Sequence, residues 1–310
     1  MTLCMAAAVL AAQTVRAQDG AQPDKVSFYF VAHEDDWQLF MNPSAFEDVA
    51  NPATRTVFIH TTAGDAGNGM GKIGRKFPYY RARENGAESA IRFMADAQGM
   101  PAEKTVARVI FNEHEIERAR YRNTVTYFLR LPDGSPSGAG YASTGFQSLR
   151  RLAGADIATI AAIDGSAVYR GWADFVSTIH AIVEFERGQA PAVQLNVSEL
   201  DATINPKDHS DHLMTAKAAL QATAELACAS RRHYVDYASA KLAANLDAQQ
   251  REMESSVVAV TAAGISALDH GSIWQPYYRS YLGRSYYRVE AGQGRCDAPR
   301  ALLSAAAARR

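Results

Sequence analysis

A histidine and three acids follow directly on an apolar run near the start of the chain. The run covers residues 26–32 (VSFYFVA) and is followed by His33, Glu34, Asp35 and Asp36. Acidic side chains this close together repel one another, so a positive charge is expected among them. Zinc accepts imidazole nitrogen and carboxylate oxygen, and a chain that turns at the end of a strand can bring His33 and Asp36 to one point. The stretch therefore predicts part of a metal site.

A second cluster supplies the missing ligand. His209 and His212 lie three positions apart around Asp211, where the pattern of residues 212–230 predicts the start of a helix. A catalytic zinc needs three protein ligands and one open position for water. The two clusters together predict one zinc ion per chain, and another divalent metal would fit the same donor types. The other histidines are interpreted as structural: His60, His114, His180, His233 and His270.

Strands and helices in alternation must position these two clusters. The patterns predict strands at 26–32, 55–63, 107–116 and 123–131, and helices at 78–99, 171–188 and 212–230. This alternation predicts an α/β layered domain with a mainly parallel sheet. Ligands of such sheets bind beyond the carboxyl ends of the strands, which is where His33 and the acids after it lie.

A glycine-rich stretch follows the second predicted strand. Residues 64–74 (GDAGNGMGKIG) contain five glycines but match neither the GxGxxG spacing nor the GK[ST] ending of phosphate-binding loops. We therefore expect a flexible wall close to the substrate and no bound nucleotide cofactor.

The overall composition bounds the class of protein. The 310-residue chain has a net charge of −1, with 47% hydrophobic and 21% charged residues. This composition is typical of a globular protein with a sizeable core. A net charge near zero gives no electrostatic reason to expect nucleic acid or an anionic membrane as a partner.

The N-terminus differs from the rest of the chain. Residues 4–12 (CMAAAVLAA) form an apolar stretch that is too short to span a bilayer, and the residues at 15 and 17 suit signal-peptidase cleavage before Gln18. We therefore predict a signal peptide at 1–17, a linker at 18–25, and export to the periplasm or the medium without stable membrane insertion after cleavage. The alternative is a disordered alanine-rich tail.

Two cysteines remain once the predicted signal peptide is removed. Cys228 and Cys296 in an exported chain predict one disulfide. Closing a loop of that length would stabilise the fold by about 4 kcal/mol in the chain-entropy model. Two unrelated free thiols are the alternative.

Four ordered motifs resemble the PIG-L or LmbE-like family of zinc-dependent N-deacetylases. VAHEDDWQLF (31–40) is similar to the family's AHPDDE motif, and TTAGDAG (61–67) to the loop after its second strand. ARENGAESAI (82–91) is similar to its Arg-Glu helix, and DHSDH (208–212) to its HPDH element. LRLPDGSPSGAGY (129–141) further resembles larger exported members that act on sugars or glycan-like substrates.

The resemblance covers roughly residues 25–290 and implies a fold and an activity. The fold would be a Rossmann-like three-layer domain over 26–290, followed by a C-terminal tail at 291–310. The activity would be hydrolysis of an N-acetyl group on an amino sugar, such as N-acetylglucosamine, or on a glycan. A catalytically inactive carbohydrate-binding protein on the same fold is the alternative. A serine nucleophile is disfavoured because the chain has no G-x-S-x-G elbow.

The resemblance also implies roles for individual residues. The zinc ligands would be His33, Asp36 and His212. Asp35 would be the general base, and His209 would face the substrate carbonyl, with Asp211 orienting His209 and keeping it protonated.

Substrate-binding residues are implied in the neighbouring motifs. These would be Arg83, Asp133 and Tyr141, and Arg83 could equally be a structural ion-pair partner of a nearby acid. The sequence departs from the family pattern at Glu34 and Ser210, which replace prolines, and at Trp37, which replaces the final acid of its motif. None of the three departures removes a predicted metal ligand.

Overall fold

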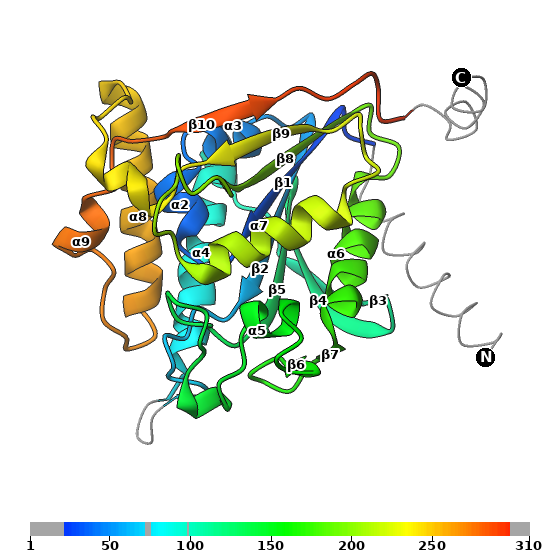
Figure 1. The fold of residues 1–310 in the computed structure, drawn as a ribbon. Coiled ribbons are helices and arrows are strands. Elements are labelled where there is room, and N and C mark those ends of the chain that lie inside the picture. The colour runs from blue at the N-terminus through cyan, green and yellow to red at the C-terminus, as the bar shows by residue number, and fades with distance from the viewer. Residues whose placement is uncertain (1–21, 72–75, 98, 298–310) are drawn as a thin grey trace, which may run out of the picture.

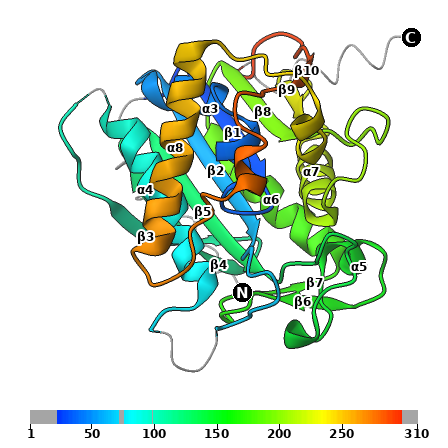
Figure 2. The ribbon, with the colours of Figure 1, turned by 90° about the vertical axis from the view of Figure 1, so that its left-hand side faces the viewer.

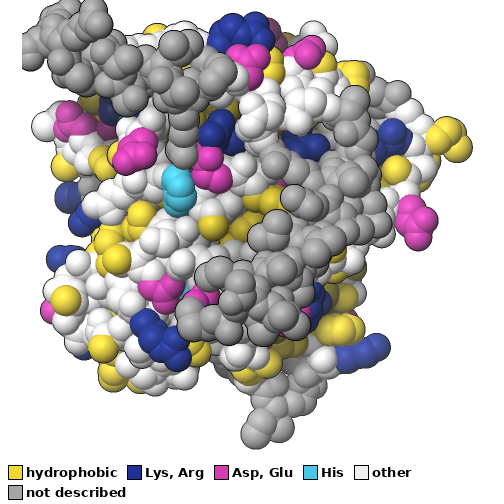
Figure 3. Space-filling view, turned by 90° about the vertical axis from the view of Figure 1, so that its right-hand side faces the viewer, with side chains coloured by type: hydrophobic (Ala, Val, Ile, Leu, Met, Phe, Trp, Pro, Cys, Tyr) yellow, Lys and Arg dark blue, Asp and Glu magenta, His cyan; other side chains and the backbone are white. Residues whose placement is uncertain are grey.

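The computed structural model describes residues 22–71, 76–97 and 99–297. The predicted signal peptide at 1–17, residues 18–21 of the predicted linker and residues 298–310 of the predicted tail lie outside the described residues. Among the described helices, none is long and apolar enough to cross a membrane. Acidic and basic side chains are interspersed on the part of the surface in Figure 3 that is not grey.

An eight-stranded, mostly parallel sheet forms the centre of the structure. Its spatial order is β10-β9-β8-β1-β2-β5-β4-β3. The strands are β1 (Lys25–Val31), β2 (Thr54–Thr62), β3 (Thr105–Phe111), β4 (His114–Tyr121), β5 (Thr124–Leu131), β8 (Ala192–Ser198), β9 (Ser230–Tyr234) and β10 (Tyr287–Glu290). The five strands from β9 to β5 run parallel, and β3, β4 and β10 are antiparallel to their neighbours.

Helices cover both faces of this sheet, so that the domain has three layers (Figures 1 and 2). One layer contains α6 (Trp172–Arg187) and α7 (Ser210–Ala222), and the other contains α2 (Asp36–Phe40), α3 (Ser44–Ala50), α4 (Tyr79–Asp96) and α8 (Ala248–Ser266). Shorter elements are α5 (Leu149–Ala153), α9 (Pro276–Arg279), the hairpin of β6 (Thr159–Ala161) and β7 (Val168–Arg170), and the 3-10 helices Ala142–Thr144 and Tyr237–Lys241. The predicted three-layer α/β class with a mainly parallel sheet is confirmed.

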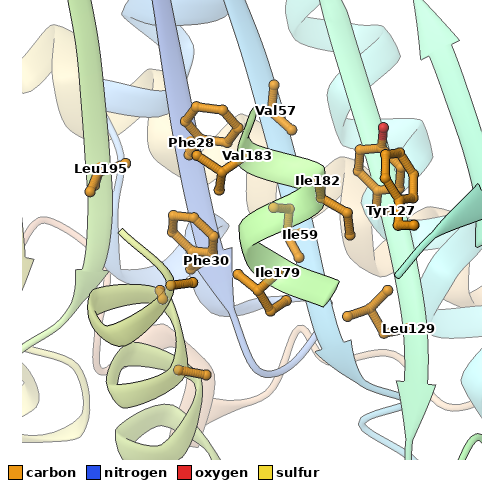
Figure 4. Close-up of a cluster of buried hydrophobic side chains, with 14 of the residues drawn as sticks. Phe28, Phe30, Val57, Ile59, Tyr127, Leu129, Ile179, Ile182, Val183 and Leu195 are labelled. Atoms are coloured by element: carbon orange, nitrogen blue, oxygen red, sulfur yellow. The ribbon is translucent and has the colours of Figure 1, made fainter. Parts of the chain in front are cut away.

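The strands alternate their side chains between the two helix layers. Phe28 and Phe30 of β1 face the α6 layer, whereas Tyr29 and Val31 face the α4 layer, as the twofold period of a strand requires. In the close-up of Figure 4, three side chains of α6 lie over the first of these faces: Ile179, Ile182 and Val183. Both faces of the central strands are therefore buried, which explains their nearly continuous apolar sequence.

The two long helices of the other layer meet at a pair of glycines. A Cβ atom on Gly264 of α8 would lie 2.8 Å from the Cα atom of Gly86 of α4. The absence of side chains at both positions lets the two helices approach closely. α8 itself begins with a capping box between Asp247 and Gln250, a local signal that predicts a helix start but that our sequence analysis missed.

Two of the predicted elements are wrong in their extent. The predicted strand at 107–116 is two strands, because the chain reverses at Asn112 and Glu113, where φ is 49° and 69°. The helix predicted at 212–230 ends at Ala222, and the Thr223 hydroxyl then donates to the carbonyl of Ala219. The other predicted strands and helices are confirmed within a few residues.

Cys228 and Cys296 form the predicted disulfide, with their Cα atoms 5.2 Å apart. The bridge joins the turn after α7 to residues 291–297, the part of the predicted tail that the structure describes. Gly292 lies so close to this turn that a Cβ atom there would be 2.1 Å from the carbonyl oxygen of Cys228. The segment after β10 is therefore fastened to the domain by both a covalent bond and close backbone packing.

Candidate metal centre and pocket

The two predicted clusters meet at the carboxyl ends of the parallel strands. The segment 33–36 follows β1, and His209 is the N-cap residue of α7, which follows β8, the neighbour of β1. The turn after β1 is held by Asp36, whose Oδ2 atom accepts hydrogen bonds from the backbone N–H groups of Ala32 (3.0 Å) and His33 (2.7 Å). These two bonds leave the Oδ1 atom of Asp36 directed toward the histidines.

Three donor atoms converge at this point. His33 Nδ1 lies 3.1 Å from His212 Nε2 and 3.4 Å from Asp36 Oδ1, and His212 Nε2 lies 3.2 Å from Asp36 Oδ1. Ligands about 2.0–2.1 Å from a tetrahedral zinc ion are about 3.3–3.4 Å from one another. The three atoms therefore form one face of a tetrahedron of the size that a zinc ion requires.

Carboxylates lie on the far side of both histidine rings, within hydrogen-bonding distance of His212 and slightly farther from His33. His212 Nδ1 is 2.9 Å from Asp208 Oδ1 and 3.3 Å from Asp236 Oδ2, and His33 Nε2 is 3.6 Å from Asp211 Oδ2. These partners assign the protons of the neutral rings to the far nitrogens, so that lone pairs face each other across 3.1 Å. Carboxylate–histidine pairs of this kind orient metal ligands.

The electrostatics of the cluster also require a positive charge. Burial alone lowers the pKa of His33, but the carboxylates of Asp36 and Asp211 raise it to about 10. For His212, Asp208 and Asp36 outweigh burial and hold the pKa well above its usual range. Burial raises the pKa of Asp36, but the two histidines hold it well below its usual range. A divalent cation among the three donor atoms would meet the same demand without extra protons. The buried His/Asp cluster is thus able to bind a metal ion.

Asp35 lies beside this cluster and is bound by Arg83. Arg83 Nη2 pairs with Asp35 Oδ1, Nη1 donates to the carbonyl of Gly64 (3.0 Å), and Nε lies 3.0 Å from Glu34 Oε2. Burial raises the pKa of Glu34 to about 8, although Arg83 lowers it. Gly64 has φ +49°, and a Cβ atom there would be 2.4 Å from Glu34 Oε2, so only glycine fits next to this pair. Arg83 is therefore an ion-pair partner of two acids and also lines the pocket, so its role as a substrate contact stays a prediction.

His209 differs from what the sequence predicted. Its Nδ1 atom accepts a hydrogen bond from the backbone N–H of Asp211 at 3.1 Å, which places the ring proton on Nε2. Burial, together with positive charge at His33 and His212, lowers the pKa of His209 to about 2. The Asp211 carboxylate accepts from the N–H of Gly134 (2.7 Å) and faces His33 instead. The expectation that Asp211 keeps His209 protonated is therefore wrong, because the Asp211 backbone contacts a neutral ring.

The other two predicted substrate-binding residues line the same space. Asp133 holds two loops together, since its carboxylate accepts from the N–H groups of Ala66 (3.2 Å) and Ser135 (2.8 Å). Tyr141 packs against the loop at Gly67, where a Cβ atom would meet its ring at 2.6 Å. The glycine-rich loop thus reaches the site through Ala66.

Two of the departures from the family pattern have structural partners. The backbone N–H of Ser210 donates to the carbonyl of Pro136 at 3.1 Å, a bond that a proline at this position could not make. Trp37 is fully buried and packs on Phe58 with ring centroids 4.8 Å apart, so it serves the core and does not reach the donor atoms.

A pocket of about 170 Å³ opens over the cluster. Seven predicted site residues line it: His33, Asp35, Asp36, Arg83, Asp133, Tyr141 and His209. The sequence analysis missed its aromatic wall, which comprises Phe40, Tyr237, Tyr277, Tyr278 and Tyr281. The density of tyrosine between 277 and 287 was the available signal. Two larger hollows, of about 390 and 310 Å³, contain none of the predicted site residues.

Comparisons with known proteins add little to this geometry. No protein-family model and no curated protein matches the chain. Among solved structures, the crystal structure of the zinc-inhibited form of teicoplanin deacetylase Orf2 is similar with a TM-score of 0.40 and 14% identity, covering 83% of this chain and 90% of that one. A similarity this low assigns neither a family nor an activity, so both must be argued from the chain's own residues.

Proposed function

We propose that the protein is a zinc-dependent hydrolase that removes N-acetyl groups from an amino sugar or a glycan-like substrate. Its domain would be of the Rossmann-like PIG-L or LmbE-like type. The observation that carries this proposal is the triangle of His33 Nδ1, Asp36 Oδ1 and His212 Nε2, with edges of 3.1–3.4 Å, beside the carboxylate of Asp35 at a pocket wall.

His33, Asp36 and His212 would hold the zinc ion. When bound there, zinc supplies Lewis-acid chemistry, which polarises an amide carbonyl and lowers the pKa of water toward about 7. Asp208, Asp236 and the Asp211 carboxylate would fix the orientation of the two imidazole ligands.

Asp35 would act as general base and then as general acid. Arg83 binds the Oδ1 atom of Asp35, and we assign the other oxygen to accept the proton of the attacking water. Asp35 would then deliver this proton to the amine nitrogen as the amide C–N bond breaks. Because Arg83 is held in turn by Glu34 and the carbonyl of Gly64, the position of the base is fixed before substrate arrives.

His209 would stabilise the oxyanion that forms on the acetyl carbonyl. Its Nδ1 atom is occupied by the N–H of Asp211, so its Nε2–H is the donor available to the pocket. A neutral donor of this kind needs no proton exchange during the reaction, and losing one such donor typically costs about 10²–10³ in kcat.

We also propose that the protein is exported. The disulfide between Cys228 and Cys296 supports this, because disulfides persist in oxidising compartments and are rare in reducing ones. The substrate would then be a partner met outside the cytoplasm.

Acetate release from N-acetylated mono-, oligo- and polysaccharides, measured with added zinc, tests the proposed activity. We expect release by the wild type and by Asp156→Asn, a control at an exposed loop position, but not by Asp35→Asn. Zinc-loaded wild type that binds these sugars and releases no acetate would instead indicate a catalytically inactive binding protein.

A further inference from the structure

The wall of the pocket that closes over the metal cluster from the C-terminal side is aromatic. Tyr237 lies directly beside the predicted ligand His212, with ring centroids 5.0 Å apart. From Tyr237 the rings continue to Tyr281 at 5.9 Å and to Tyr277 at 6.5 Å. A continuous aromatic surface therefore leads away from the metal cluster.

This surface runs from the interior to solvent. Tyr281 is only 2% exposed, whereas Tyr277 is 55% exposed and Trp274, three residues before it, is 41% exposed. Tyr277 belongs to α9, the short orange helix that lies between α8 and α7 in Figure 2. Large aromatic side chains left exposed at the mouth of a pocket are a feature of ligand-binding surfaces.

The chemistry of the two walls indicates an amphipathic ligand. The aromatic wall is built mainly of tyrosines, so apolar ring faces carry hydroxyl groups at their tips. The opposite wall is lined by residues that carry polar groups, namely Asp133, Arg83 and Tyr141. A sugar ring matches both walls, because its axial C–H groups pack on aromatic faces and its hydroxyl groups lie around its edge. A hydrocarbon chain would leave the hydroxyl groups without partners.

The size of the pocket limits how much of the ligand it can hold. Its volume of about 170 Å³ is below the roughly 300–1,000 Å³ of sites that enclose a whole drug-sized ligand. One acetamido group and part of its sugar ring fill such a space, so the rest of a longer substrate must lie outside. Tyr277 lines the pocket and is exposed, and Trp274, which is also exposed, precedes it by three residues in the chain.

We propose that Tyr277 and Trp274 form a second sugar-binding subsite, which stacks on the ring next to the one that is deacetylated. The substrate is therefore an N-acetylated oligosaccharide of at least two residues. This inference rests on the proposed deacetylase function, because that function defines which ring occupies the pocket.

Steady-state kinetics of acetate release from N-acetylglucosamine and from tri-N-acetylchitotriose test the subsite. In Tyr277→Ala we expect KM for the trisaccharide to rise roughly five- to tenfold more than KM for the monosaccharide, the usual effect of losing one aromatic stacking contact. Tyr277→Phe should keep the wild-type trisaccharide KM. Trp274 is not one of the residues that line the pocket. Trp274→Ala should also raise KM for the trisaccharide. Tyr287→Ala, an exposed tyrosine on β10, should change neither KM.

Calorimetric binding of tri-N-acetylchitotriose to zinc-loaded Asp35→Asn protein separates the subsite from the activity. Weaker binding on adding Tyr277→Ala supports the subsite even if no acetate is released by the wild type, in which case only the proposed activity fails. Equal trisaccharide KM in wild type, Tyr277→Ala and Trp274→Ala overturns the subsite and leaves the activity standing. Affinity could instead rise with the length of an N-acyl chain and fall in Tyr277→Ala. That result would assign the aromatic wall to a hydrocarbon chain and would also overturn the sugar-binding subsite. If the protein binds none of these sugars and releases acetate from none of them, both proposals are overturned.

Discussion

In Asp36→Asn, the two sets of partners of Asp36, backbone N–H groups on one side and the metal site on the other, would compete for a single side-chain oxygen. In the wild type, Oδ2 accepts two backbone N–H groups, at 3.0 and 2.7 Å, and Oδ1 faces His33 and His212. An asparagine has only one oxygen. If that oxygen stays on the backbone N–H groups, its NH₂ group occupies the position of the metal-facing oxygen and cannot bind a cation.

The alternative rotamer has a cost that follows from the same contacts. If the oxygen turns toward the metal, the NH₂ group faces two buried N–H donors and leaves both unpaired. Each unsatisfied buried donor costs about 1–3 kcal/mol, or about 2–6 kcal/mol for the two. The zinc affinity of Asp36→Asn should therefore fall by roughly 30-fold to 10⁴-fold, whichever rotamer is adopted. The metal-free Asp36→Asn protein should also be less stable than the wild type, because the ionised Asp36 carboxylate pairs with protonated His33 and His212 when no metal is bound.

Zinc dissociation constants from competition with a chromophoric chelator measure the first effect, and thermal unfolding of the metal-free proteins measures the second. Asp35→Asn is the matched control, because it makes the same chemical change at the neighbouring position and should keep wild-type zinc affinity. An Asp36→Asn protein that binds zinc as tightly as the wild type would refute the assignment of Oδ1 as a ligand. A metal-free variant that is as stable as the wild type would refute the pairing of Asp36 with the two protonated histidines.

Three further outcomes are expected. Zinc-loaded Asp35→Asn should lose a factor of about 10²–10⁴ in kcat, measured by acetate release, and a near wild-type rate would contradict its role as general base. Burial raises the pKa of Glu254 from about 4.5 to about 8. Between these two pH values the folded state keeps a proton that the unfolded state loses. The stability that this carboxyl group contributes is therefore complete below about pH 4.5 and is lost as the pH rises to about 8. Glu254→Gln keeps an oxygen for the N–H of Gly283, so its unfolding free energy in urea should fall less between pH 5 and 8 than that of the wild type, and equal slopes would count against this. Replacing Cys228 and Cys296 by serine should lower the unfolding free energy by about 4 kcal/mol in urea titrations, and an unchanged midpoint would show that the bridge does not form in solution.

The metal cluster could be predicted because its signals are local. A strand that ends in His33, Glu34, Asp35 and Asp36, and a helix entry with two histidines, each occupy a few consecutive residues. The rule that ligands gather beyond the carboxyl ends of parallel strands then places them together. In the structure their donor atoms lie within 3.4 Å of one another. This convergence follows from the fold rule and needs no particular long-range contact to be known from the sequence.

The contacts around the cluster could not be predicted in the same way. The partner of Glu34 was not predicted: Glu34 lies 3.0 Å from Arg83, which also binds Asp35 from a helix almost fifty positions along the chain. The Asp211 carboxylate faces His33 and not His209 because it accepts a hydrogen bond from the N–H of Gly134, which lies in the loop after β5. Such choices are made by tertiary packing, and a spacing rule carries no information about them.

The aromatic wall was missed for a related reason. The segment around Tyr277 and Tyr281 has neither the twofold period of a strand nor a long helical period, and α9 is only four residues long. Nothing near it in sequence indicates that Tyr281 packs against Phe40 of α2, with ring centroids 5.1 Å apart. Tyr237 likewise lies in a 3-10 helix between β9 and α8, where no regular pattern marks it as part of a site.

The metal-binding residues and the tyrosines of the aromatic wall are synthesised at different times, because they lie in different parts of the chain. The donor atoms come from residues 33, 36 and 212, whereas the tyrosines of the aromatic wall are residues 237, 277, 278 and 281. A chain that emerges from its amino end therefore has every metal-binding side chain available before the surface that would select a sugar has been made. The same separation lets changes accumulate in the last quarter of the chain, and so alter what is recognised, while the residues that would perform the hydrolysis remain untouched.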